Sequence, residues 1–164
     1  MIINNRIALA MYFGELGFKK GAEIGVFRGR YSKRLWERMP GLKLFSVDSW
    51  MGKYEKEEAE ARASLGRFPG ITIIKGMSTD VAKTIPDASL DFVYIDGDHD
   101  YEAAKADIEA WTPKVRVGGI VSGHDYQLPD VRKAVDEVAK KRGVELSVTT
   151  TDNSREHPSW FFRV

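Results

Sequence analysis

Short apolar runs alternate along this chain with longer segments in which hydrophobic residues recur every three or four positions. The short runs predict strands at residues 22–26, 42–47, 71–74, 90–95, 120–122, 144–149 and 160–164. The longer segments predict helices at residues 7–16, 31–39, 51–65, 101–111 and 131–142. Pro40, Pro113 and Gly143 end three of these helices, as proline and glycine commonly do.

Strands that alternate with helices of this length predict a parallel sheet covered by helices on both faces. Right-handed crossovers then lead to an α/β fold with a Rossmann-like, doubly wound and mostly parallel sheet. We expect one domain over residues 1–164, with an N-terminal helix in 1–20, a core in 21–126, and a C-terminal helix and last strands in 127–164.

The composition fits a globular domain and excludes several kinds of chemistry. Among 164 residues, 25 are Lys or Arg and 24 are Asp or Glu, so the net charge of +1 gives no general attraction to nucleic acid or membranes. The chain has no cysteine, which excludes disulfides, thiolate metal sites and cysteine nucleophiles. It also lacks an apolar run long enough to cross a bilayer and a recognisable signal peptide. We therefore expect a soluble cytoplasmic protein.

Polar residues and a glycine stand at the carboxyl ends of the expected strands. They are Gly25, Asp48, Ser78, Asp96 and Asp125. Ligands of open parallel α/β sheets bind at this edge. A strand that only builds a core has no reason to end in an acid, so the series indicates a binding or catalytic domain.

The turn after the first expected strand differs from the dinucleotide-binding pattern G-x-G-x-x-G. In that pattern the middle glycine lets the backbone approach a pyrophosphate, and here Phe27 takes its place, so a pyrophosphate is disfavoured. Gly25 still leaves room for a smaller ligand. Asp48 ends the second expected strand, where a carboxylate accepts hydrogen bonds from both hydroxyls of a ribose. The alternatives are a simple tight turn and an aspartate that caps the next helix.

The segment 96–100, DGDHD, follows the fourth expected strand and is rich in ligand atoms. Asp98 and Asp100 suit capping of the next helix. Asp96 differs, because an acid at the end of a buried central strand is costly without a partner. The fourth and fifth strands should be neighbours, so Asp96 and Asp125 would converge and could hold a divalent cation.

Together these motifs resemble the class I S-adenosylmethionine-dependent methyltransferases. The resemblance spans about residues 21–126 and rests on the following motifs: E-x-G-x-x-x-G from Glu23, the acid Asp48, GMSTD at 76–80, YIDGDH at 94–99, and Gly118-Gly119 leading to GHDY at 123–126. The chain is most similar to the compact small-molecule O-methyltransferases, which include catechol and caffeoyl-type enzymes and metal-dependent macrolide-sugar enzymes. The resemblance implies methyl transfer from S-adenosylmethionine to a hydroxyl of a small molecule.

The resemblance also implies how the core would contact the cofactor. Gly25 would lie against the methionine portion, Ser32 would hold its carboxylate, and Asp48 would bind the ribose. Met77 and Ser78 would flank and hydrogen-bond the adenine. Helix capping is the alternative for Ser32 and Ser78. The implied cofactor-binding residues are Glu23, Gly25, Phe27, Gly29, Ser32, Asp48, Ser49, Met77, Ser78 and Asp96.

In the resembling enzymes a general base stands three residues after the acid of strand four, which makes Asp96 and His99 the expected catalytic residues. An imidazole titrates near neutrality and suits removal of a hydroxyl proton, although an exposed loop histidine is the alternative. Metal-dependent members hold Mg²⁺ with positions that correspond here to Asp96, His124 and Asp125. A histidine suits Mn²⁺, Fe²⁺ or Zn²⁺ better than Mg²⁺, and His124 could instead act as a base or contact the substrate.

Three other functions stay open. A non-catalytic sensor or partner subunit would bind S-adenosylmethionine without releasing product. A nicotinamide-dependent oxidoreductase is disfavoured by Phe27, and a nucleic-acid methyltransferase by the balanced charge. We expect a small-molecule acceptor and no membrane partner, while a pocket without a lid invites closure by a second subunit in a homodimer.

Two further expectations concern residues outside these motifs. Trp50, Met51 and Tyr54 follow Asp48 and are expected to pack within a helix, with a role in the pocket wall as the alternative. His157 lies between two expected late strands and is interpreted as structural.

Overall fold

The computed structural model describes residues 3–150 and 157–164. Its elements, in chain order, are α1 (Arg6–Glu15), β1 (Lys20–Ile24), α2 (Arg30–Arg38), β2 (Lys43–Asp48), α3 (Glu55–Leu65), β3 (Ile71–Lys75), α4 (Ser78–Thr84), β4 (Leu90–Ile95), α5 (Tyr101–Trp111), a 3-10 turn (Thr112–Lys114), β5 (Val115–Gly123), α6 (Pro129–Arg142), β6 (Ser147–Val148) and β7 (Trp160–Arg163). None of the helices in these ranges is long and apolar enough to span a membrane.

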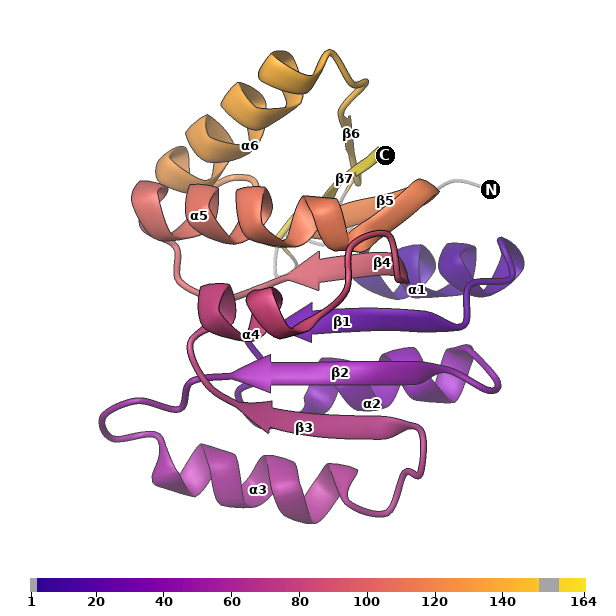
Figure 1. Ribbon diagram of the computed structural model, residues 1–164, viewed down its shortest axis with the longest axis vertical. Coiled ribbons are helices and arrows are strands. Elements are labelled where there is room, and N and C mark those ends of the chain that lie inside the picture. The colour runs from indigo at the N-terminus through magenta and orange to yellow at the C-terminus, as the bar shows by residue number, and fades with distance from the viewer. Residues whose placement is uncertain (1–2, 151–156) are drawn as a thin grey trace.

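Within the described residues, seven strands form one sheet in the order β3-β2-β1-β4-β5-β7-β6. Strands β1 to β5 run parallel, and β7 is antiparallel to both β5 and β6. The strand order changes direction between β1 and β4, which is where ligands bind in sheets of this kind. The predicted α/β fold with a mostly parallel sheet is therefore confirmed (Figure 1).

Helices cover both faces of the sheet (Figure 1). Helices α1, α2 and α3 contribute to the core on one face, and α4, α5 and α6 to the core on the other. Side chains of β4 alternate between these cores: Phe92 and Tyr94 join the first, whereas Val93 and Ile95 join the second. A strand buried on both sides in this way reads as one continuous apolar run in the sequence.

Several elements differ from the hydrophobic pattern, including β1, which lies at 20–24 instead of 22–26, and β6, which covers only 147–148 of the expected 144–149. Residues 51–54 precede α3 and are not helical, although they were expected within it. The seven residues of α4 are too few to establish a helical period, so this helix was not predicted. Strand β5 begins at Val115 and includes the expected turn at 117–119, because Gly118 takes a φ of 78° where the register against β4 shifts.

Candidate active site

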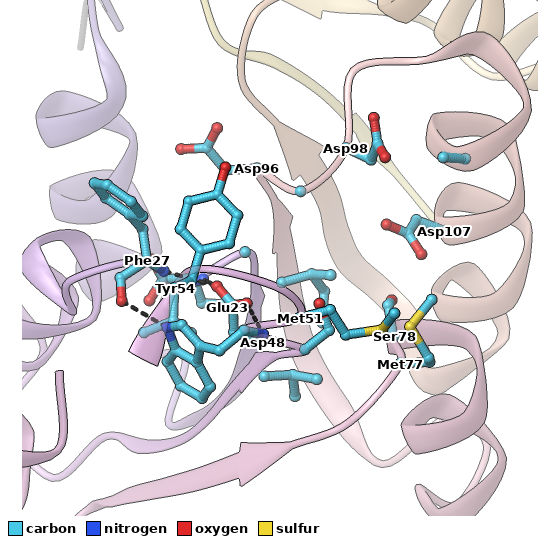
Figure 2. Close-up of a pocket in the computed structure, with 18 of the residues that line it drawn as sticks. Glu23, Phe27, Asp48, Met51, Tyr54, Met77, Ser78, Asp96, Asp98 and Asp107 are labelled. Carbon is cyan, nitrogen blue, oxygen red and sulfur yellow. Dashed lines mark hydrogen bonds between the residues drawn. The ribbon is translucent and has the colours of Figure 1, made fainter. Parts of the chain in front are cut away.

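A cavity of about 900 Å³ opens at the carboxyl ends of β1, β2, β3 and β4. It is bounded by the turn after β1, the loop after β2, the start of α4, and the segment that joins β4 to α5 (Figure 2). This volume suits a ligand of cofactor size. All the expected cofactor-binding residues line the cavity except Gly29 and Ser32.

Gly25 permits the closest approach between the turn after β1 and the loop after β4. It has a φ of 85°, and a Cβ added there would lie 1.9 Å from the carbonyl oxygen of Asp96. Gly29 has a φ of 77°, and its Cβ would lie 2.9 Å from the side chain of Leu65. Both positions therefore require glycine for reasons within the fold itself.

Asp48 holds the turn after β1 in place. Its Oδ2 accepts hydrogen bonds from the backbone N–H groups of Val26 and Phe27, both at 2.8 Å, and its Oδ1 accepts one from Trp50 at 2.8 Å. The Trp50 indole N–H donates to the Phe27 carbonyl oxygen at 2.8 Å. Asp48 therefore does not cap α3, which begins at Glu55, and its carboxylate lines the cavity beside the turn.

Ser32 is fully buried under the cavity and does not line it. Its hydroxyl donates a hydrogen bond to Glu23 and lies 2.9 Å from the hydroxyl of Ser46. The expected contact of Ser32 with a cofactor carboxylate is thus not what this arrangement offers, because buried neighbours already use the hydroxyl. Glu23 is itself buried, and this burial raises its pKa from 4.5 to about 8.

The raised pKa of Glu23 predicts how stability depends on pH. The folded state favours the neutral carboxyl, so the free energy of unfolding should fall from about pH 5 to about pH 8, by up to about 1.4 kcal/mol per pH unit. Glu23→Gln should flatten this slope and raise the melting temperature at pH 8 relative to wild type. Melting curves of both proteins across this range test the prediction, and identical slopes would contradict it.

Arg6, the first residue of α1, lines the cavity beside Asp96, and the sequence did not predict it there. Its Nη1 lies 3.6 Å from Asp96 Oδ2, and its guanidinium carbon lies 5.4 Å from the centre of the Tyr31 ring. The Tyr31 hydroxyl donates to the carbonyl oxygen of Arg6 at 2.9 Å. Arg6 therefore places a cation in the cavity wall beside Asp96, and the buried acid Glu23 lines the same cavity.

The three histidines of the chain gather around Asp125. Asp125 Oδ2 lies 2.7 Å from His99 Nε2 and 3.3 Å from His124 Nδ1, and Oδ1 lies 2.5 Å from His157 Nδ1. The interpretation of His157 as only structural missed this contact. Asp125 has a φ of 58°, a strained conformation for a residue other than glycine and one that clusters at functional sites.

The two acids of this cluster have opposite pKa shifts. Burial raises the pKa of Asp96, an effect that the nearby His124 partly offsets. Burial also acts to raise the pKa of Asp125, but hydrogen bonds from His124 and His157 hold that pKa well below its usual range. A neutral imidazole beside an ionised Asp125 is an arrangement that can accept a proton from a bound hydroxyl.

Asp96, His124 and Asp125 also meet the geometric requirement for a metal site. One ligand atom from each lies within 4.8 Å of the others. Two carboxylate oxygens and one imidazole nitrogen fit a divalent cation, and the histidine favours Mn²⁺, Fe²⁺ or Zn²⁺ over Mg²⁺. The residues present are thus compatible with the metal that the resemblance implies.

Large apolar side chains stand exposed at the rim of the cavity. Phe27, Met51, Tyr54 and Met77 all line it, and the rings of Phe27 and Tyr54 meet edge to face with centroids 6.1 Å apart. The expectation that Met51 and Tyr54 pack within a helix is wrong, since both lie in the loop before α3. Trp50 does pack inside, against the core side of that helix.

Asp107 on α5 is a cavity residue that the motifs did not reveal. It is only 7% exposed, and its burial raises its pKa, while a hydrogen bond with Ser78 lowers it. The Trp111 indole N–H donates to the same Ser78 hydroxyl at 2.8 Å. One signal was present in the sequence, because Asp107 interrupts the apolar stripe of Ala104, Ile108 and Trp111.

Comparison with known proteins matches the same region of the chain. A family profile described as a methyltransferase domain matches residues 22–126. A curated relative from Sinorhizobium fredii, the uncharacterized protein y4gI, is 30% identical in an alignment over 91 residues that covers 51% of this chain and 10% of the relative. The chain thus spans about a tenth of the length of that relative.

Solved structures share the fold at low sequence identity. An O-methyltransferase from Bacillus cereus in complex with S-adenosylhomocysteine is 17% identical, with a TM-score of 0.79 over 96% of this chain and 80% of that one. TomG from Streptomyces achromogenes, an O-methyltransferase of tomaymycin synthesis solved with S-adenosylmethionine, is 18% identical, with a TM-score of 0.74 over 97% of this chain and 79% of that one. A precorrin-6y C5,15-methyltransferase from Geobacter metallireducens is 16% identical, with a TM-score of 0.73 over 95% of this chain and 86% of that one. Likeness at this level concerns the fold alone, and the different names mean that the fold does not select the acceptor.

Proposed function

The chain belongs to the methyltransferase domain family, and from this premise we propose that it transfers a methyl group from S-adenosylmethionine to a hydroxyl of a small molecule. The observation that carries the proposal is the order of groups along the carboxyl edge of the sheet. Asp48 lies on β2, Gly25 follows β1, Asp96 follows β4, and Asp125 follows β5. This order matches a ligand whose ribose lies at Asp48 and whose methionine chain passes Gly25, with the methyl group on the sulfur between them directed toward the acids after β4 and β5.

The cofactor would lie along this edge. Asp48 would accept hydrogen bonds from the ribose hydroxyls, and the methionine chain would pass Gly25. The amino acid end carries one positive and one negative charge, which suits the acid Asp96 on one side and Arg6 on the other. Arg6 would thus take the role that Ser32 was expected to have.

The transfer is an in-line displacement in which the acceptor oxygen bonds the methyl carbon as the sulfur–carbon bond breaks. S-adenosylhomocysteine leaves, and the hydroxyl proton must go to a base. We assign that base to His99, since an Nε2–H donated to Asp125 leaves Nδ1 free to accept the proton. Asp125 would orient the ring and stabilise the charge that the ring acquires.

Asp96, His124 and Asp125 would hold a divalent cation, which when bound would lower the pKa of the acceptor hydroxyl and orient it. We expect chelation to lower turnover by about 10–100-fold and Mn²⁺ to restore it more fully than Mg²⁺. The variants Asp96→Asn and Asp125→Asn should not regain turnover when either metal is added. Full turnover after chelation, with no gain from either metal, would rule out the metal and leave the methyltransferase proposal standing.

The proposed activity is tested by product formation. The protein is incubated with S-adenosylmethionine and a panel of catechols, other phenols and sugar hydroxyls, and mass spectrometry measures S-adenosylhomocysteine and the gain of one methyl group. At least one acceptor should yield both products together. Cofactor binding without any release of S-adenosylhomocysteine would instead favour the non-catalytic sensor or partner subunit.

A further inference from the structure

Two exposed methionines border the cavity, and neither takes part in the proposed methyl transfer. Met51 is 64% exposed and Met77 is 51% exposed, and both line the cavity. They follow β2 and β3, which are neighbouring parallel strands with Asp48 opposite Lys75. Figure 2 shows both side chains at the end of the cavity where Ser78 lies. Thioether groups from two separate segments thus reach solvent at the same part of the cavity.

The backbone before Met51 directs that side chain outward. The preceding residue, Trp50, has a φ of 40°, which is strained for a residue other than glycine. Its backbone N–H donates to Asp48 Oδ1 and its indole N–H donates to the Phe27 carbonyl oxygen, both at 2.8 Å. Trp50 is consequently only 3% exposed, whereas Met51 stands in solvent. A strained loop therefore presents an apolar thioether at the cavity, which favours a functional role for Met51.

Met77 occupies a position that usually suits a different type of residue. It is the N-cap of α4, where Ser, Thr, Asp or Asn is preferred because its side chain accepts a hydrogen bond from the first turn. The side chain of Met77 makes no such bond. Helix α4 therefore gains no capping from this methionine, whose exposed side chain lines the cavity instead.

Methionine is the sulfur-containing residue at which this chain can be oxidised, because it has no cysteine. Met39 is 1% exposed and lies protected in the core. Met11 is 48% exposed on α1, but it does not line the cavity. Among the methionines of the described residues, Met51 and Met77 are thus the ones at which oxidation would change the cavity.

We propose that Met51 and Met77 form an oxidation-sensitive site, at which hydrogen peroxide converts both thioethers to sulfoxides and thereby weakens cofactor binding. A sulfur lone pair attacks one peroxide oxygen, so that an S–O bond forms as the O–O bond breaks. The sulfur is oxidised, and the second oxygen leaves as water after a proton moves to it from the first. The inference rests on the proposed function, because it takes S-adenosylmethionine as the ligand of this cavity.

The expected loss of affinity follows from the change in polarity. A nucleoside whose ribose lies at Asp48 would lie between the loop after β2 and the start of α4, which carry Met51 and Met77. A thioether makes favourable contacts with aromatic rings, whereas a sulfoxide is a polar group that prefers water. Oxidation of both residues should therefore weaken the binding of S-adenosylhomocysteine by about 5–50-fold.

Calorimetric titration with S-adenosylhomocysteine, before and after treatment with hydrogen peroxide, tests the inference. Peptide mass spectrometry measures the sulfoxide content of each methionine in the same samples. The affinity of wild-type protein should fall as Met51 and Met77 are oxidised, and it should return after treatment with methionine sulfoxide reductases A and B. S-adenosylhomocysteine added before the peroxide should slow the oxidation of these two residues and leave that of Met11 unchanged.

Two leucine variants separate this site from general oxidative damage. Leucine resembles methionine in volume and cannot form a sulfoxide. The double variant with Met51→Leu and Met77→Leu should keep its affinity for S-adenosylhomocysteine after peroxide treatment. Met11→Leu removes a comparably exposed methionine outside the cavity, and this variant should lose affinity as wild-type protein does.

Each contrary result has a distinct meaning. Unchanged affinity of wild-type protein in which both residues are fully oxidised would overturn the inference, whatever the variants do. An equally large loss of affinity in the double variant would assign the damage to another residue and overturn the inference as well. Failure of untreated wild-type protein to bind S-adenosylhomocysteine would contradict the proposed function itself.

Discussion

Replacement of His99 by alanine should lower the turnover of an identified acceptor by about 10²–10⁴-fold, the usual effect of removing a general base. His99 lines the cavity beside Asp96, and its Nε2 lies 2.7 Å from Asp125 Oδ2. The affinity for S-adenosylhomocysteine should change by less than about threefold, because the base contacts the acceptor and not the cofactor. Single-turnover rates and calorimetry on the same preparations measure the two quantities.

His157→Ala is the matched control for this prediction. His157 also contacts Asp125, through Oδ1, but it does not line the cavity. Its removal should lower turnover much less than removal of His99. If His99→Ala keeps a rate near that of wild type, His99 is not the base, and His124 becomes the next candidate.

Asp48→Ala should weaken the binding of S-adenosylhomocysteine by about 10–150-fold, as expected for loss of charge-assisted hydrogen bonds to the ribose. The structure adds a second cause, because the substitution also removes the acceptor of three backbone N–H groups, at Val26, Phe27 and Trp50. The turn beside Gly25 would then lose its anchor.

Asp48→Asn separates these two causes. The amide keeps the size of the side chain and one acceptor oxygen, so the turn should hold better than in Asp48→Ala, while the charge that favours the ribose is lost. We expect a melting temperature between those of wild type and Asp48→Ala, together with a clear loss of affinity. Unchanged affinity in both variants would remove Asp48 from the cofactor site.

The fold could be predicted because its causes are local. The apolar run at 90–95 and the helical spacing of hydrophobic residues at 101–111 can each be recognised from the local sequence. Glycine or proline marks the ends of such elements. The strand-end acids followed from the same pattern, since the ends of parallel strands share one edge. The prediction that the chain belongs to a methyltransferase family rested on these motifs and is confirmed by the family match over residues 22–126.

The parts of the site that were missed depend on contacts between distant segments. Arg6 lies near Asp96 because α1 packs beside the first turn of α2. The hydrogen bond from the Tyr31 hydroxyl to the Arg6 carbonyl oxygen is part of this packing. His157 reaches Asp125 because β7 runs antiparallel to β5, with Trp160 opposite Gly123. No spacing along the chain encodes either pairing.

The role expected for Ser32 was inferred from its position in the motif alone, without knowledge of the side chains that surround it in the fold. The hydroxyl of Ser32 stands at the start of α2, as expected for an anion site, but the side chain turns inward to Glu23 and Ser46. The direction of a side chain on a helix depends on what is buried beneath it. Glu23 and Ser46 come from two different strands, so only the assembled sheet determines that environment.

The central claim is that this cavity binds S-adenosylmethionine, and calorimetric titration tests it most directly. Wild-type protein is titrated with S-adenosylmethionine, S-adenosylhomocysteine and NAD, and the two sulfur compounds are repeated with Asp48→Asn. We expect one molecule of either sulfur compound per chain, weakened in the variant, and no heat of binding from NAD. Binding of NAD with no binding of S-adenosylmethionine or S-adenosylhomocysteine would contradict the account.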